Sequence, residues 1–180
     1  MKNKYLLSLL WVIVSGFGVL MAQEIAIIPQ PAHLIVKNES FKFGKQLKVC
    51  IASYRGDSVT LVFDSFKDDF QKATGIKVTS VHSEAKAGIV LSVNQTLAPE
   101  AYKLDVSPKQ IRIEAARPAG FYYALQTLKQ LISRHVMAGG AVGGRQEGRI
   151  PTVEIEDVPR FEWRGFMLDE GRHFFGKDEV

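Results

Sequence analysis

The amino-acid sequence predicts an α+β domain over residues 23–150, in which helices cover a largely antiparallel sheet. Two stretches repeat apolar residues every three or four positions, as the buried faces of amphipathic helices do. A third stretch alternates apolar and polar residues on both sides of a short turn, as a β-hairpin with one buried face does. Hydrophobic residues make up 46% of the chain and charged residues 23%, which is typical of a globular protein.

The first 22 residues have the pattern of a secretory signal peptide. Lys2 and Lys4 precede an apolar run over residues 5–20, and the small residue Ala22 follows. Cleavage after Ala22 would give an exported protein, whether periplasmic, extracellular or lumenal, with no membrane span. An uncleaved anchor is the alternative, but a serine and two glycines dilute a run that is close to the minimum of about 17 residues for a span.

Two extended segments and a helix are expected at the start of the mature chain. Pro29 and Pro31 enforce an extended entry, and short strands are expected at residues 34–36 and 47–51. A helix follows, capped by Asp57 or Ser58 and ended by Gly75. Its apolar face is rich in phenylalanine and consists of Val59, Val62, Phe63, Phe66, Phe70 and Ala73. An aromatic stripe at this spacing indicates a core face and not a ligand site.

Further strands are expected at residues 76–81 and 89–93. Residues 102–106 and 111–115 predict a hairpin around a Ser-Pro-Lys-Gln turn. A second helix begins after Pro118, and its apolar face consists of Phe121, Ala124, Leu125, Leu128, Leu131 and Ile132. The glycine-rich residues 138–145 are expected to form a flexible loop.

The composition of this domain argues against several kinds of function. Signal cleavage lowers the formal net charge from +4 to +2, and the basic residues are scattered among acidic ones, so a nucleic-acid partner is not expected. The domain has no glycine-rich phosphate loop, no paired metal ligands and no nucleophile elbow, so we expect neither a cofactor nor a metal ion. Cys50 is expected to be a small buried residue rather than a reactive thiol, and His33, His82 and His135 to be surface or capping residues.

The last 22 residues carry the most informative pattern in the chain. The apolar run at residues 166–168 predicts a buried strand, and charged side chains follow it directly. Charged groups at the end of a buried strand usually face a ligand. Residues 176–179 then resemble a turn that leads into a helix, with acidic residues at its N-terminal end.

Several motifs occur in the order found in one enzyme family. They are IIPQP at residues 27–31, YKL at 102–104, IRI at 111–113, AGFYYALQTL at 119–128, IEDVPRF at 155–161, RGFMLD at 164–169 and RHFF at 172–175. Together they resemble the N-terminal part of a glycoside hydrolase family 20 enzyme, a β-N-acetylhexosaminidase. The resemblance covers essentially the whole chain after residue 22.

This resemblance implies a domain order and a sugar-binding residue. Residues 23–150 would form the non-catalytic domain, and residues 151–180 the linker and first strand of a truncated (β/α)8 TIM barrel. Arg172 would bind hydroxyls of the terminal N-acetylhexosamine, since a guanidinium offers five donors in a planar fork. Asp169 and His173 would support it, although a salt bridge between Arg172 and a neighbouring carboxylate is the alternative. Arg164 and Asp157 are expected to be structural.

The resemblance also implies an activity that this chain would not perform alone. Family members are exo-acting retaining enzymes that remove terminal N-acetylglucosamine or N-acetylgalactosamine from glycans by substrate-assisted catalysis, outside the usual two-carboxylate scheme. Their catalytic Asp-Glu pair lies on a later barrel strand, so we expect no catalytic residue here, and Asp178 and Glu179 are not that pair. A short secreted carbohydrate-binding or interaction module without hydrolase activity is the alternative.

Overall fold

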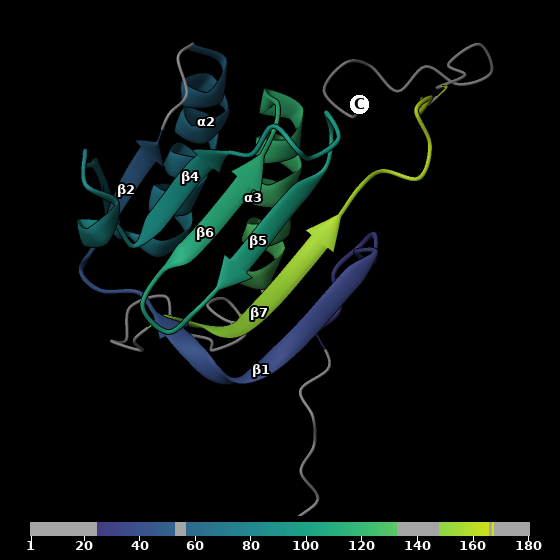
Figure 1. The fold of residues 1–180 in the computed structure, drawn as a ribbon. Coiled ribbons are helices and arrows are strands. Elements are labelled where there is room, and N and C mark those ends of the chain that lie inside the picture. Colours follow the sequence, from purple (N-terminus) through teal and green to yellow (C-terminus); the bar gives the residue numbers. More distant parts are fainter. Residues whose placement is uncertain (1–24, 53–56, 133–147, 166, 168–180) are drawn as a thin grey trace, which may run out of the picture.

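The computed structural model describes residues 25–52, 57–132, 148–165 and 167. They form a seven-stranded sheet with two long helices on one face (Figure 1). In chain order the elements are β1 (His33–Lys42), β2 (Gln46–Ala52), α2 (Asp57–Thr74), β3 (Lys77–Ser80), the short 3-10 helix η1 (Glu84–Lys86), β4 (Ile89–Val93), β5 (Tyr102–Val106), β6 (Ile111–Ala115), α3 (Pro118–Ile132) and β7 (Arg149–Asp157). The α+β class predicted from the sequence is confirmed.

The sheet is mixed, so the expectation of a largely antiparallel sheet was wrong. Its strand order is β1-β7-β5-β6-β4-β2-β3. The pairs among β1, β7, β5 and β6 are antiparallel, whereas β6 with β4, β4 with β2 and β2 with β3 are parallel. The β2–β3 pair is parallel because α2 carries the chain from the end of β2 back to the start of β3, and a crossover of this kind makes the two strands run in the same direction.

The hairpin and both helices lie where their patterns predict them. β5 and β6 pair from Tyr102 opposite Ala115 to Val106 opposite Ile111, with Leu104 opposite Ile113. Helix α2 ends at Thr74, and Gly75 follows with a φ of 71°, the left-handed conformation in which glycine commonly ends a helix. The predicted glycine-rich loop at residues 138–145 lies outside the described residues.

The core lies between the sheet and the two helices. The phenylalanine side chains of α2 are buried, with Phe66 only 1% exposed and its ring 5.8 Å from that of Phe70. The predicted face of α3 is buried in full, as Phe121, Leu125 and Leu128 illustrate. Burying side chains of this size supplies the largest favourable contribution to folding. The aliphatic face of α3 is therefore a core face, as the sequence predicts. The aromatic face of α2 is a core face as far as Phe70, whereas Ala73 at its end is exposed, contrary to the prediction.

The opposite face of the sheet is charged where β7, β5 and β6 cross it. Alternate residues of β5 point away from the helices, and Lys103 among them forms an ion pair of 2.5 Å with Glu156. Lys37 on β1 likewise pairs with Glu154 on β7. Such half-exposed pairs contribute little to stability. This face resembles an ordinary solvated surface.

Cys50 is buried on the side of the sheet near η1. Its side chain packs with Ala87 and Val90 in a small apolar cluster, and the residue is 3% exposed. The expectation of a small buried residue is confirmed. His33 and His82 are exposed, as expected, while His135 lies outside the described residues.

Strand β7 extends the sheet beyond residue 150, where the sequence places the end of the domain. It pairs with β5 from Val153 to Asp157 and with β1 along most of its length. Residues 151–157 thus belong to the sheet and not to a linker. In Figure 1, β7 lies between β1 and β5, and the chain leaves the sheet at its C-terminal end.

A buried strand is predicted at residues 166–168, of which the structure describes only Met167, and Met167 is neither buried nor in a strand. Met167 belongs to no strand and is 89% exposed, and Phe166 and Leu168 lie outside the described residues. A buried strand needs hydrogen-bonded neighbours and cover on both faces. The described sheet supplies neither, because its edge strands, β1 and β3, do not pair with this segment. No barrel strand is present among the described residues.

Candidate functional site

The residues that the sequence assigns to substrate are not placed by the structure. Arg172, Asp169 and His173 all lie outside the described residues, as do Asp178 and Glu179. The described chain reaches residues 158–165, which leave the end of β7 and precede these positions. We refer to residues 158–165 as the exit segment. It is the described stretch of chain between the sheet and the expected sugar-binding residues.

The exit segment begins at a polar junction around Asp157. One carboxylate oxygen of Asp157 accepts a hydrogen bond of 3.0 Å from the backbone N–H of Ala32. The other accepts a longer one of 3.4 Å from the hydroxyl of Tyr102. Asp157 thus joins the end of β7 to β5 and to the segment before β1, which is the structural role expected for it.

Tyr102 lies beneath this junction and is almost fully buried. Its hydroxyl shares a hydrogen bond of 2.7 Å with the hydroxyl of Thr127 on α3. Burial disfavours the phenolate and raises the pKa of Tyr102 to about 12, and the nearby Asp157 carboxylate acts in the same direction. The phenol therefore remains protonated at physiological pH, so it is a structural hydrogen-bonding group.

Arg164 attaches the exit segment to the domain. Its Nη2 atom donates to both carboxylate oxygens of Glu100, each at 2.9 Å, and to the Tyr123 hydroxyl at 3.0 Å. Its Nη1 atom donates to the backbone carbonyl of Phe161 within the exit segment. The guanidinium also lies over the ring of Tyr123, 5.8 Å from the centroid. We call Arg164, Glu100 and Tyr123 the Arg164 anchor.

The charges of the anchor reinforce one another. The hydrogen bond from Arg164 to Glu100 raises the pKa of the Arg164 guanidinium above its usual value, and the hydrogen bond to Tyr123 adds a smaller effect in the same direction. Tyr123 in turn donates a weak hydrogen bond of 3.4 Å to Glu100. The arginine and glutamate side chains are 40% and 37% exposed, so solvent screens the pair substantially. The anchor fixes geometry more than it adds stability.

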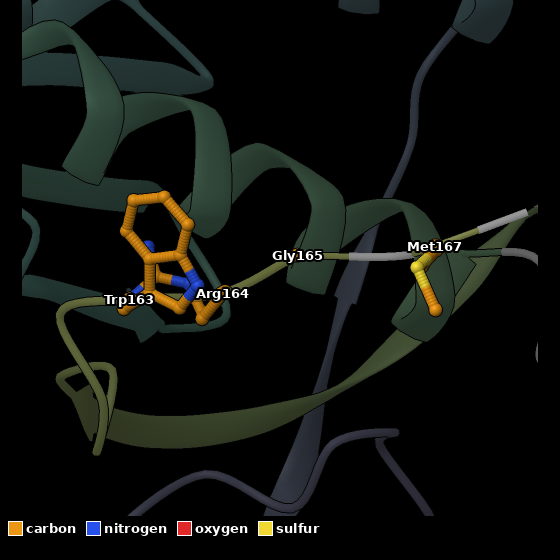
Figure 2. A pocket seen from close by; sticks show the side chains of 4 residues that line it. All are labelled: Trp163, Arg164, Gly165 and Met167. Carbon is orange, nitrogen blue, oxygen red and sulfur yellow. The ribbon is translucent and has the colours of Figure 1, made fainter.

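An open hollow lies along the same stretch of chain. Trp163, Arg164, Gly165 and Met167 line it, and Figure 2 shows Trp163 and Arg164 at one end of the row and Met167 at the other. Trp163 is 91% exposed, so its indole ring is available for contact. A shallow hollow of this kind lacks the enclosing walls and converging polar groups of a small-molecule site.

The described residues offer no other chemical centre. They contain no group of three or more histidine, cysteine, aspartate or glutamate side chains that could hold a metal ion. None of their helices combines the length and apolarity that crossing a membrane requires. In the part of the chain that the structure describes, the notable feature is the anchored exit segment.

Sequence reasoning did not identify the two partners of Arg164. Glu100 is 64 positions away and Tyr123 is 41 positions away along the chain. Glu100 lies in a loop, and Tyr123 lies in a helix next to residues of its buried face. No local pattern distinguishes either residue, because their role depends on how the helix and the loop meet in the folded domain.

Comparison with known proteins gives a consistent family match. The model of glycosyl hydrolase family 20, domain 2, matches residues 24–158. A beta-hexosaminidase of Vibrio furnissii is 30% identical over 162 residues, which are 88% of this chain and 24% of that protein. The chain thus spans about a quarter of the length of that relative.

Solved structures agree with the fold. The Streptomyces plicatus N-acetyl-beta-hexosaminidase, solved in complex with Thio-NAglucal, superposes with a TM-score of 0.67 at 32% identity and covers 85% of this chain and 30% of its own. A GH20 exo beta-N-acetylglucosaminidase of Vibrio harveyi, in complex with N-acetylglucosamine, gives a TM-score of 0.65 at 33% identity, covering 82% of this chain and 21% of its own.

Proposed function

The chain belongs to glycosyl hydrolase family 20 through its domain 2, and we propose that it is the N-terminal part of an exo-acting β-N-acetylhexosaminidase. The single observation that carries this proposal is the family match over residues 24–158. Relatives named beta-hexosaminidase that align over most of this chain support it. The substrates would be glycans or oligosaccharides that end in N-acetylglucosamine or N-acetylgalactosamine.

The α+β domain would have no part in the chemistry. Its described residues bury Tyr102 in protonated form, pair several surface carboxylates with lysines or arginines, and hold Cys50 in an apolar cluster. None of these groups is free to act as a nucleophile or a general acid in a cleft. The domain would instead support a (β/α)8 catalytic barrel whose first strand and loop begin in residues 161–180.

Within that first strand and loop, Arg172 would bind the sugar. A planar guanidinium can donate to two neighbouring hydroxyl oxygens at once and remains charged at any working pH. Asp169 and His173 would orient it. In the proposed retaining mechanism the acetamido oxygen of the substrate attacks the anomeric carbon, while an Asp-Glu pair on a later barrel strand orients the acetamido group and protonates the leaving oxygen.

Export would place the enzyme where such glycans occur. Residues 1–22 have the charged start, apolar run and small cleavage residue of a signal peptide. We propose cleavage after Ala22 and a periplasmic, extracellular or lumenal location. N-terminal sequencing of the exported protein would read Gln23 as the first residue if this is right, and Met1 if it is wrong.

The activity can be tested on the full-length protein encoded with this chain. Wild type should hydrolyse the 4-nitrophenyl β-glycosides of N-acetylglucosamine or N-acetylgalactosamine. Arg172→Ala should lower kcat/KM by about a hundredfold, because a hydrogen bond from a charged group to a sugar hydroxyl is worth up to about 3 kcal/mol. A folded wild type without hydrolysis would contradict the proposal and would favour a binding module.

A further inference from the structure

We propose that Arg164 is a positioning residue, which fixes on the α+β domain the point from which the chain continues to Arg172. The inference deepens the proposed function and rests on it, because sugar binding is assigned there to Arg172. Arg164 precedes Arg172 by eight positions in the sequence. A displacement of the exit segment at Arg164 would therefore be passed on to the segment that carries the sugar-binding residue.

The guanidinium of Arg164 performs two tasks at once. Nη2 binds the domain, through both oxygens of Glu100 and the hydroxyl of Tyr123. Nη1 binds the carbonyl of Phe161 and so closes a turn within the exit segment itself. The planar fork of arginine can point its two nitrogens in these two directions, whereas a lysine has a single nitrogen. The position thus favours arginine for its shape as well as its charge.

The receptor for Arg164 is held firmly by the core. Glu100 precedes Ala101, whose N–H donates to the carbonyl of Ala98 at 3.0 Å and whose own carbonyl lies against Gly120 in the first turn of α3. Tyr123 stands on α3, and its neighbour Ala124 is fully buried. Both partners of Arg164 are consequently attached to backbone that the core immobilises, which suits them to hold another segment in place.

The remainder of the exit segment offers no comparable attachment. Phe161 and Trp163 are 66% and 91% exposed. Arg160 contacts the ring of its neighbour Phe161, 5.7 Å from the centroid. Among the described residues of the exit segment, Arg164 alone donates side-chain hydrogen bonds to the α+β domain. The position of the segment should therefore depend on this one side chain.

The test uses the full-length enzyme with Arg164→Ala, Arg164→Lys, Glu100→Gln and the double variant Arg164→Ala/Glu100→Gln. Because a misplaced Arg172 weakens binding of the substrate and the transition state alike, KM should rise about tenfold while kcat stays within about twofold. Lysine should not restore the wild-type KM. The double variant should be no worse than Arg164→Ala, since both changes remove the same contact.

Arg160→Ala is the matched control, because Arg160 is an exposed arginine of the same segment whose described contact is with its neighbour Phe161. Its KM should equal that of wild type. If Arg164→Ala fails to fold, the KM of Glu100→Gln alone tests the inference, since this substitution preserves the shape of the side chain and removes its charge. Wild-type KM values in the anchor variants, or equal losses in Arg160→Ala, would overturn the inference while the proposed function stands. An inactive but folded wild type would overturn the proposed function, and the role of Arg164 with it.

Discussion

Gly120 packs directly on the backbone carbonyl oxygen of Ala101: a Cβ atom at position 120 would lie 2.4 Å from that oxygen. The first turn of α3 can approach the loop before β5 this closely only because residue 120 has no side chain. The same contact helps to fix the backbone next to Glu100. A close helix–loop approach therefore underlies both the core and the Arg164 anchor.

Gly120→Ala should destabilise the domain by about 2 to 3 kcal/mol, because the added methyl group overlaps backbone that cannot move aside. Urea unfolding followed by fluorescence would measure the change. Gly44→Ala is the control, since the nearest atom to its new Cβ would be 3.8 Å away and its φ is not positive. Equal losses of stability in the two variants would show that the contact at Gly120 has no particular importance.

Because of Tyr102, the free energy of unfolding of the domain should fall as pH rises through the alkaline range. The tyrosine releases its proton near pH 10 in the unfolded chain but near pH 12 in the folded one, so the unfolded state binds fewer protons between these values. Stability should be fully present below pH 10 and should fall as pH rises towards 12, by about 2 to 3 kcal/mol at most. Urea unfolding between pH 9 and roughly pH 11.5 would measure it.

Tyr102→Phe should remove that pH dependence and should cost about 1 kcal/mol at neutral pH, because it leaves the buried Thr127 hydroxyl without its partner. The half-exposed Tyr122 supplies the comparison: Tyr122→Phe should leave the alkaline profile as in wild type. A wild-type profile in Tyr102→Phe would mean that another group is responsible.

Phe66→Ala should be among the most damaging single changes in α2. The ring is 1% exposed and packs between Phe63 and Phe70, so its removal leaves a cavity. We expect a loss of about 3 to 5 kcal/mol in the free energy of unfolding. Leu61→Ala on the same helix should cost under about 0.5 kcal/mol, because that side chain is 69% exposed. Similar losses in both variants would contradict the assignment of the buried face.

The thiol of Cys50 should be inert in the folded protein. It is 3% exposed and surrounded by Ala87 and Val90, so a thiol reagent can reach it only when the domain opens. Ellman's reagent should leave the Cys50 thiol unreacted in native buffer and should react with it completely in denaturant. Rapid reaction of the native protein would show that the cluster around η1 is not closed.

The elements that could be predicted from sequence are those with a strong local period. Residues 102–106 and 111–115 alternate apolar and polar side chains, and they form β5 and β6 with those bounds. Helix α3 begins at Pro118, because proline is favoured in the first turn. In these segments the local order of apolar and polar residues determines the secondary structure, so the sequence of the segment is enough to predict it.

Strand β7 and the parallel half of the sheet depend on information that lies elsewhere in the chain. Pro151 weakens the strand pattern of β7, yet β5 pairs with β7 only from Val153 onward, so no bond to β5 is lost at the proline. The direction of β3 and β4 depends on crossovers rather than on alternation. The Arg164 anchor joins residues 64 positions apart, and no local signal can predict such a contact.

The most direct test of the central proposal compares two substrates of the full-length protein, the 4-nitrophenyl β-glycoside of N-acetylglucosamine and that of glucose. They differ only at C2, where the first carries the acetamido group that would act as the nucleophile. We expect turnover of the N-acetylated substrate and at least about a thousandfold lower kcat/KM for the glucoside, because the glucoside lacks the attacking oxygen. Comparable hydrolysis of both substrates, or of neither by a folded protein, would contradict it.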